Sequence, residues 1–232
     1  MTELQTENAS PLALRQLEHD SGVLLIVASC AMVGFMAIHP QAHAHDTASL
    51  LQDIARQATF NTFVHGTLMG IISLVSLALW GFAQSRGLDR MTVRFGLVSF
   101  AVGTGSLIGA AAINGIVLSN LARHYAGSDA VTVESVRPLL SLCMEANHAC
   151  DFIGVFGLSL ALAAWSYSLW RDGARGLAVL GILAGIGAPT LLLLGKLPMS
   201  VHGFGAFVLA QTIWMVGVGY QMWRGTFTPP RN

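Results

Sequence analysis

Three long apolar stretches of this sequence share one layout, because each begins with a histidine and ends with an arginine. The pairs are separated by 21, 23 and 22 residues, and they are His65 and Arg86, His148 and Arg171, and His202 and Arg224. A helix of this length is about 32 to 35 Å long, close to the ~30 Å of a bilayer's hydrocarbon core. The layout therefore predicts three membrane-spanning helices. If they run in one direction, all three histidines lie at the same membrane surface.

The composition indicates an integral membrane protein. Hydrophobic residues make up 53% of the sequence and charged residues only 10%, whereas soluble domains carry about 25% charged residues. The formal net charge is zero and no basic patch is present, which argues against a nucleic-acid partner. We expect most of the protein surface to be in contact with the lipid bilayer.

Hydropathy divides the chain into six expected spans, which makes the fold class all-α, a polytopic bundle of three helical hairpins. A polar arm over residues 1–19 precedes the transmembrane domain at 20–224, and a polar tail follows at 225–232. The expected spans are 22–39, 61–84, 95–121, a stretch ending at 171 that continues a longer helix from near 133, 177–194 and 199–223.

Two local patterns add detail to this bundle. Between the first two spans, Asp46 or Thr47 is expected to cap a short helix with one apolar face, which we expect to lie on the membrane surface. In the third span, Gly105 and Gly109 form a GxxxG pair, which predicts close approach of another helix.

The distribution of lysine and arginine predicts the orientation. Eight of these residues fall on the side of the two termini and four on the opposite side, so both termini are expected in the cytoplasm. The expected location is the plasma membrane, or the inner membrane if the organism is Gram-negative. The spans look nearly bare of polar groups at mid-membrane, which argues against a carrier.

Histidines and carboxylates gather at the outer ends of the expected spans. Glu145, His148 and Asp151 share one helical face, and the Glu-x-x-His spacing occurs in metal sites of helical bundles. Further imidazoles come from His65, His202 and a tract with the pattern HxxxHxH, at His39, His43 and His45. This set predicts a centre for a transition metal, Zn, Cu or Fe, in which His43 and His45 are the weaker candidates.

The metal hypothesis includes an enzyme. A metal with an open coordination position activates water, and Glu145 or Asp151 would then be the general base for a membrane-embedded or periplasmic small-molecule substrate. Two alternatives stay open. One is an electron-transfer protein with haem b held between two histidines, His65 with His148 or His148 with His202. The other is a non-catalytic subunit bound to partner subunits, in which the polar groups form a structural hydrogen-bonded network.

Overall fold

The computed structural model describes residues 11–41, 46–196 and 201–227, and its described secondary structure is entirely helical. Within these residues, six continuous helical segments are long and apolar enough to cross a membrane, with α3, η1 and α4 forming one of them. The elements are α1 (Pro11–Ala37), α2 (Thr47–Arg86), α3 (Met91–Ala112), the π-helix η1 (Ile113–Leu118), α4 (Ser119–Tyr125), α5 (Ala130–Arg171), α6 (Arg175–Leu193) and α7 (Val201–Trp223). The prediction of a helical bundle with six spans of this kind is confirmed.

Two helix boundaries differ from the sequence predictions. The expected surface helix after Asp46 is not separate, because α2 runs without a break for 40 residues. Asp46 caps it, accepting a 2.9 Å hydrogen bond from the Ser49 N–H, and no proline interrupts it before Gly87 ends it with a φ of 88°. The second half of the expected polar arm likewise forms the first turns of α1.

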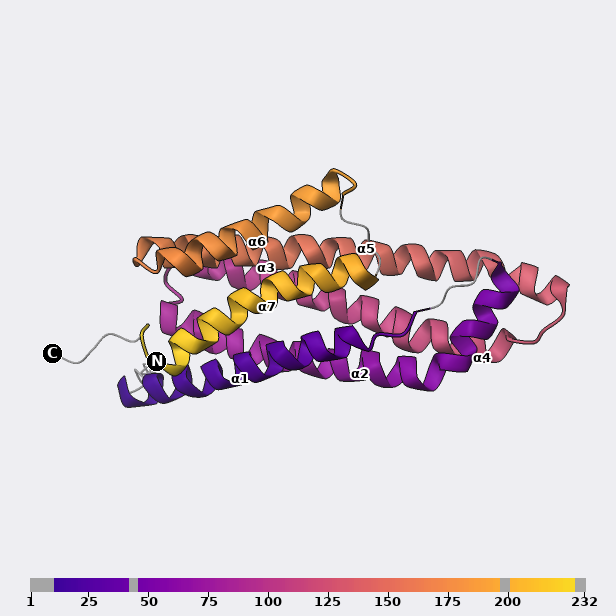
Figure 1. Ribbon diagram of the computed structural model, residues 1–232, viewed down its shortest axis with the longest axis horizontal. Helices are drawn as coiled ribbons and strands as arrows, with labels where there is room; N and C mark the ends of the chain where they lie inside the picture. The colour runs from indigo at the N-terminus through magenta and orange to yellow at the C-terminus, as the bar shows by residue number, and fades with distance from the viewer. Residues whose placement is uncertain (1–10, 42–45, 197–200, 228–232) are drawn as a thin grey trace, which may run out of the picture.

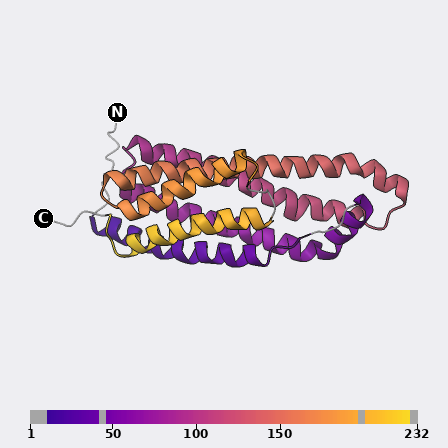
Figure 2. The same ribbon diagram turned by 45° about the horizontal axis from the view of Figure 1, so that its top comes forward.

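Three helical segments extend well beyond the others. The 40 residues of α2 and the 42 residues of α5 correspond to about 60 Å each, twice the thickness of the hydrocarbon core. The 19 residues of α6 span only about 28 Å. Figures 1 and 2 show α2, α5 and the α3–α4 segment continuing past the ends of α1, α6 and α7. These continuations form an extension of the bundle.

The bundle and its extension have separate hydrophobic cores. In the bundle, Trp165 and Trp214 stack with ring centroids 6.4 Å apart, and Phe82 meets both rings edge-on. In the extension, a smaller cluster includes Leu51 on α2 and Leu140 on α5. Along α2, the segment between Leu51 and Phe82 carries His65, so this histidine lies between the two cores.

Helix α3 packs closely on α5 through glycines that the GxxxG prediction did not identify. A Cβ on Gly103 would lie 2.7 Å from the Leu158 nitrogen, and a Cβ on Gly157 would lie 2.6 Å from the Gly103 Cα. A Cβ on Gly105 would meet no described atom within 4 Å, and one on Gly109 would meet only the Cys150 Sγ, at 3.6 Å. The close approach is therefore real, but the predicted pair does not provide it.

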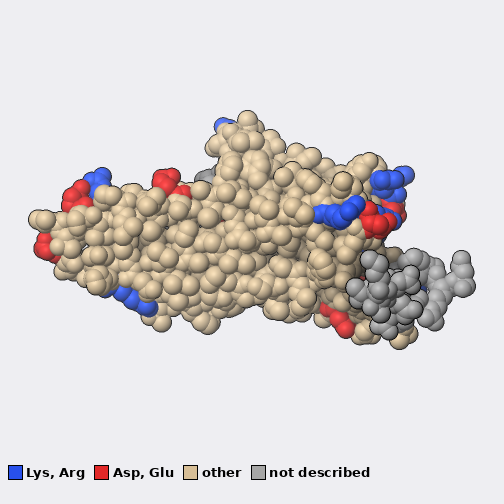
Figure 3. Space-filling view, turned by 180° about the vertical axis from the view of Figure 1, so that it is seen from behind, with Lys and Arg blue, Asp and Glu red and all other residues tan. Residues whose placement is uncertain are grey.

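Charged side chains gather near the two ends of the molecule. Figure 3 shows lysine, arginine, aspartate and glutamate near both ends of one face, with a broad uncharged region between them. Large apolar side chains such as Leu77, Val98 and Leu183 are exposed on the bundle. An uncharged band of this kind fits a surface that faces lipid.

Candidate functional site

A cavity of about 290 Å³ lies inside the bundle, bounded by side chains of α1, α2, α3, η1, α5 and α7. Its apolar part includes Val75, Phe100 and Leu158, and its polar part includes His39, His65, Asn114, Asn147, His148 and Asp151. Val75 is ten residues from His65, about 15 Å along α2. The cavity is thus polar toward the extension and apolar toward the aromatic core.

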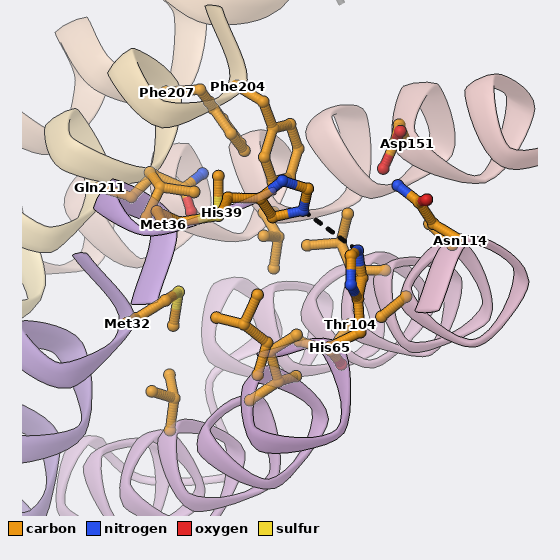
Figure 4. Close-up of a pocket in the computed structure, with 18 of the residues that line it drawn as sticks. Met32, Met36, His39, His65, Thr104, Asn114, Asp151, Phe204, Phe207 and Gln211 are labelled. Carbon is orange, nitrogen blue, oxygen red and sulfur yellow. Dashed lines mark hydrogen bonds between the residues drawn. The ribbon is translucent and has the colours of Figure 1, made fainter. Parts of the chain in front are cut away.

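His39 and His65 meet at the polar part of the cavity. Their Nε2 atoms are 3.1 Å apart, and Figure 4 shows the two imidazoles directed at each other. His39 follows the end of α1, and its Nδ1 lies 2.9 Å from the Pro40 carbonyl oxygen. The Nδ1 of His65 lies 2.9 Å from the Asn61 carbonyl oxygen, one turn earlier in α2.

These contacts determine where the ring protons sit. A carbonyl oxygen only accepts hydrogen bonds, so Nδ1 carries the proton in both rings. A neutral imidazole has one N–H, so both Nε2 atoms then carry lone pairs. With both Nδ1 atoms donating, the two Nε2 lone pairs, 3.1 Å apart, are available to a proton donor or to a metal ion.

The π-helix η1 positions His65. Inside η1, the carbonyl oxygens of Asn114 and Gly115 accept hydrogen bonds from the side chains of Asn61 (3.0 Å) and Thr62 (2.7 Å) on α2. Gly115 presents no side chain to His65, whose Cβ lies 2.3 Å from where a Cβ of residue 115 would be. Single π turns are found most often at functional sites, and this one brings α3 against the histidine.

The predicted face of α5 contributes only in part. Asp151 and His148 line the cavity, and the Asp151 carboxylate lies within electrostatic reach of His148. Asp151 also accepts a 2.9 Å hydrogen bond from Asn147. Glu145, farther along the extension, is exposed and is not part of the lining. The expectation that all three groups converge on one centre is not supported.

Three of the predicted histidines cannot be placed as ligands. His43 and His45 lie outside the described residues. His202 belongs to α7, but its side chain is not among those described. The backbone of α7 still gives its level, because Gly22 of α1 packs against Gly219 of α7. His39 is seventeen residues after Gly22, and His202 is seventeen residues before Gly219. Because α1 and α7 run antiparallel, both positions lie at about the same height along the bundle axis.

The structure does not contain the predicted multi-ligand metal centre within its described part. Among residues 11–41, 46–196 and 203–227, no three side chains of the His, Cys, Asp and Glu types lie close enough together to hold a metal ion. Asp151 lines the cavity away from the pair of His39 and His65, as Figure 4 shows. What remains is a site of two imidazoles.

The polar groups in the deeper part of the cavity were not predicted from the sequence. Thr104, Gln211 and Thr212 line it, although this level of the spans was expected to be nearly bare. The signal was present for Gln211, which interrupts the run GFGAFVLAQTIWMVG. A polar residue inside such a run is a functional candidate by default.

Comparison with known proteins gives no match to a family model, a curated protein or a solved structure. The geometry of the cavity and of its histidine pair is therefore the basis for a functional proposal.

Proposed function

We propose that this chain is a multi-pass membrane protein that binds a transition-metal ion through His39 and His65, beside a cavity for a small molecule. The observation that carries the proposal is the pair of facing Nε2 atoms, 3.1 Å apart, with both Nδ1 atoms committed to backbone carbonyls. Histidines that ligate metals characteristically donate their other ring N–H to such a group, which fixes the tautomer and the ring orientation.

The separation of the two nitrogens fits neighbouring ligands of one metal. With metal–nitrogen bonds of about 2.0 to 2.1 Å and a tetrahedral angle, two ligating nitrogens are about 3.3 Å apart. The observed separation is 3.1 Å, and the rings would have to tilt so that both Nε2 atoms point at one metal ion. Imidazole suits Zn, Cu and Fe alike, so all three stay candidates.

Catalytic zinc sites have three protein ligands and leave one position open for water or substrate, so the histidine pair would need one further ligand. His202 is the candidate for a third ligand, because the register of α1 and α7 brings its position to the level of His39. Of the two predicted general bases, Asp151 lines the cavity, whereas Glu145 is exposed and outside the lining; Asp151 could act on a substrate in the cavity only through a bridging water. A metal-dependent enzyme acting on a lipid-soluble or periplasmic molecule is the corresponding activity.

The arginine distribution supports the proposed placement in a plasma or inner membrane. The end of the bundle that carries Arg86, Arg90, Arg171 and Arg175 would face the cytoplasm. The histidine pair would then lie at the outer edge of the hydrocarbon core, since His65 is about 31 Å along α2 from Arg86.

Metal content of the purified protein tests the proposal. The wild-type chain is prepared in detergent, and its bound metals are measured by elemental mass spectrometry after metal add-back and removal of excess. We expect a stoichiometric metal ion that is lost in His39→Ala and in His65→Ala. His124→Ala is the matched control, because His124 is exposed on α4, outside the cavity lining, and it should retain the metal.

Two other results would contradict the metal proposal. Unchanged metal content in both variants would place the ion elsewhere, and a wild-type protein that binds no metal after add-back would show that the pair is not a metal site. The visible spectrum of the same sample tests the haem b alternative, since a Soret band would require a bis-histidine haem. A metal-free and haem-free protein would favour the subunit alternative, tested by co-purification of partner subunits.

A further inference from the structure

Gln211 carries an unpaired amide deep in the cavity wall. Its side chain is only 3% exposed, it lines the cavity, and its Nε2 finds no hydrogen-bond partner among the described residues. An unpaired buried donor is costly, and most buried polar groups in native proteins are paired. This amide is therefore suited to a partner that comes from outside the chain.

The surroundings of Gln211 determine what that partner can be. From the same helix, Phe207, Val208 and Met215 line the cavity, and Phe100 and Leu158 line it from α3 and α5. Thr104, which lines the cavity from α3, donates its hydroxyl to the Phe100 carbonyl at 2.8 Å. The deeper wall thus holds the unpaired N–H donor of Gln211, beside the hydroxyl group of Thr212, among apolar side chains. This favours a hydrogen-bond acceptor on an otherwise apolar molecule.

The position of Gln211 indicates how deep this acceptor lies. Gln211 is nine residues beyond His202 on α7, about 13 Å farther into the bundle. In Figure 4, Gln211 lies on one side of the histidine pair, and Asn114 and Asp151 lie on the other. A ligand that meets Gln211 therefore occupies the apolar part of the cavity, away from the polar groups of α5.

We infer that the cavity binds a lipid-soluble carbonyl compound whose C=O oxygen accepts a hydrogen bond from Gln211 Nε2. The rest of the molecule packs against the apolar lining. Acyl esters and quinones share this chemistry, and both are carried by membranes. The inference goes beyond the proposed metal site and depends on different residues, so metal-depleted protein should bind the same ligand.

The probe is methyl nonyl ketone labelled with carbon-13 at its carbonyl, added to the full chain in detergent. Isotope-edited infrared spectroscopy reports the hydrogen bond, which lowers the C=O stretching frequency relative to the ketone in the empty micelle. Affinity is measured in parallel by the ligand-induced rise in the thermal unfolding midpoint, with undecane as the matched hydrocarbon without an acceptor.

The wild-type protein should bind the ketone with a lowered C=O frequency. In Gln211→Leu, the lowered frequency should disappear and the ketone affinity should fall about fivefold to tenfold, as expected for one hydrogen bond, while undecane binding persists. Gln84→Leu is the control, because Gln84 lies outside the lining, and it should behave as wild type. Gln211→Leu removes an unpaired buried donor, so the empty variant should unfold at the same or a higher temperature.

An unshifted C=O band in the wild-type complex, or equal ketone affinity in wild type and Gln211→Leu, would overturn the inference. A second comparison uses methyl decanoate and a decyl-substituted benzoquinone. If the ester or the quinone binds more tightly than undecane, the inference is supported, and the tighter of the two identifies the class of natural ligand. If neither binds more tightly than undecane, the inference is overturned. Running all titrations with and without a chelator separates this result from the outcome of the metal proposal.

Discussion

Gly115 of η1 lies directly against His65 of α2. A Cβ at residue 115 would come within 2.3 Å of the His65 Cβ and 2.7 Å of its Cγ, which is closer than side chains approach one another. The absence of a side chain at this one position lets the π-helix touch the histidine while Thr62 donates a 2.7 Å hydrogen bond to the Gly115 carbonyl. Helix packing and the orientation of the imidazole are thus coupled.

Gly115→Ala should therefore displace His65. We expect a loss of about 1 to 3 kcal/mol of stability from overpacking, and metal binding weakened about tenfold or more, as when the support of a ligand is disturbed. Thermal unfolding in detergent and metal titration measure the two effects. Gly105→Ala is the matched control on α3, since its Cβ would meet no described atom within 4 Å. Equal behaviour of the two variants would contradict the coupling.

The sequence predicted a helix from His65 to Arg86 because a long apolar run favours a spanning helix without reference to the rest of the fold. The 21 residues from His65 to Arg86 indeed belong to unbroken α2. It did not predict that α2 begins at Thr47, because a polar amphipathic stretch is equally compatible with a surface helix. The extension is stabilised by contacts with α4 and α5, and such tertiary partners cannot be deduced from one segment.

Asn61 connects the histidine pair to the π-helix by two of its groups. Its side-chain amide donates to the Asn114 carbonyl and to the Ser119 Oγ, each at 3.0 Å, while its carbonyl accepts from His65 Nδ1. Asn61→Ala leaves the π-helical carbonyl without this donor in a buried place. We expect a loss of about 2 kcal/mol in the free energy of unfolding.

Thermal unfolding of Asn61→Ala in detergent checks this value. Thr67→Val is a suitable control on the same helix, because Thr67 is half-buried and its hydroxyl donates to the Phe63 carbonyl of its own helix. An unfolding midpoint of Asn61→Ala within the range of Thr67→Val would show that the π-helix does not need this amide.

Packing glycines show the second limit of prediction from sequence. A GxxxG pair at Gly105 and Gly109 was visible, but the contact depends on which face α3 turns toward α5. That face carries Gly103, against Gly157 and Leu158. The packing of the whole bundle decides which side of each helix faces its neighbour. The spans are apolar on all sides, so their hydrophobic periodicity does not reveal that side.

Asp129 caps α5 at the far end of the extension. It accepts hydrogen bonds from the N–H groups of Val131 and Thr132, at 3.0 and 3.1 Å. The backbone N–H and the hydroxyl of Thr132 hold the pKa of the Asp129 carboxyl below its usual range. A carboxyl whose folded pKa is lowered contributes stability above its usual pKa, and that stability is lost as the pH falls through the lowered value.

Acidification should therefore destabilise the extension in part through Asp129. In Asp129→Asn the side chain still caps the helix, since Asn and Asp are comparable N-caps, but it no longer titrates. We expect the difference in unfolding midpoint between neutral and acid pH to be smaller in Asp129→Asn than in wild type. An identical pH dependence of both proteins would show that this cap does not contribute to acid sensitivity.

Arg86 is a buried cation at the other end of α2. Its side chain is 6% exposed and forms an ion pair with Asp172, whose side chain is 31% exposed and also binds Arg90 at 2.7 Å. The Arg86 guanidinium lies over the Phe227 ring, 4.9 Å from its centroid. These contacts join α2, the α5–α6 turn and the segment after α7.

Asp172→Asn should destabilise the protein by leaving the Arg86 charge buried with a weaker partner. Removing one member of a fully buried pair costs about 3 to 5 kcal/mol. Because Asp172 is partly exposed, we expect about 2 kcal/mol, measured as the shift in denaturant midpoint in detergent. Arg90→Gln removes the more exposed partner of the same carboxylate and should cost less than about 1 kcal/mol. If Arg90→Gln proved the more damaging change, the exposed pair rather than the buried one would hold this end of the bundle together.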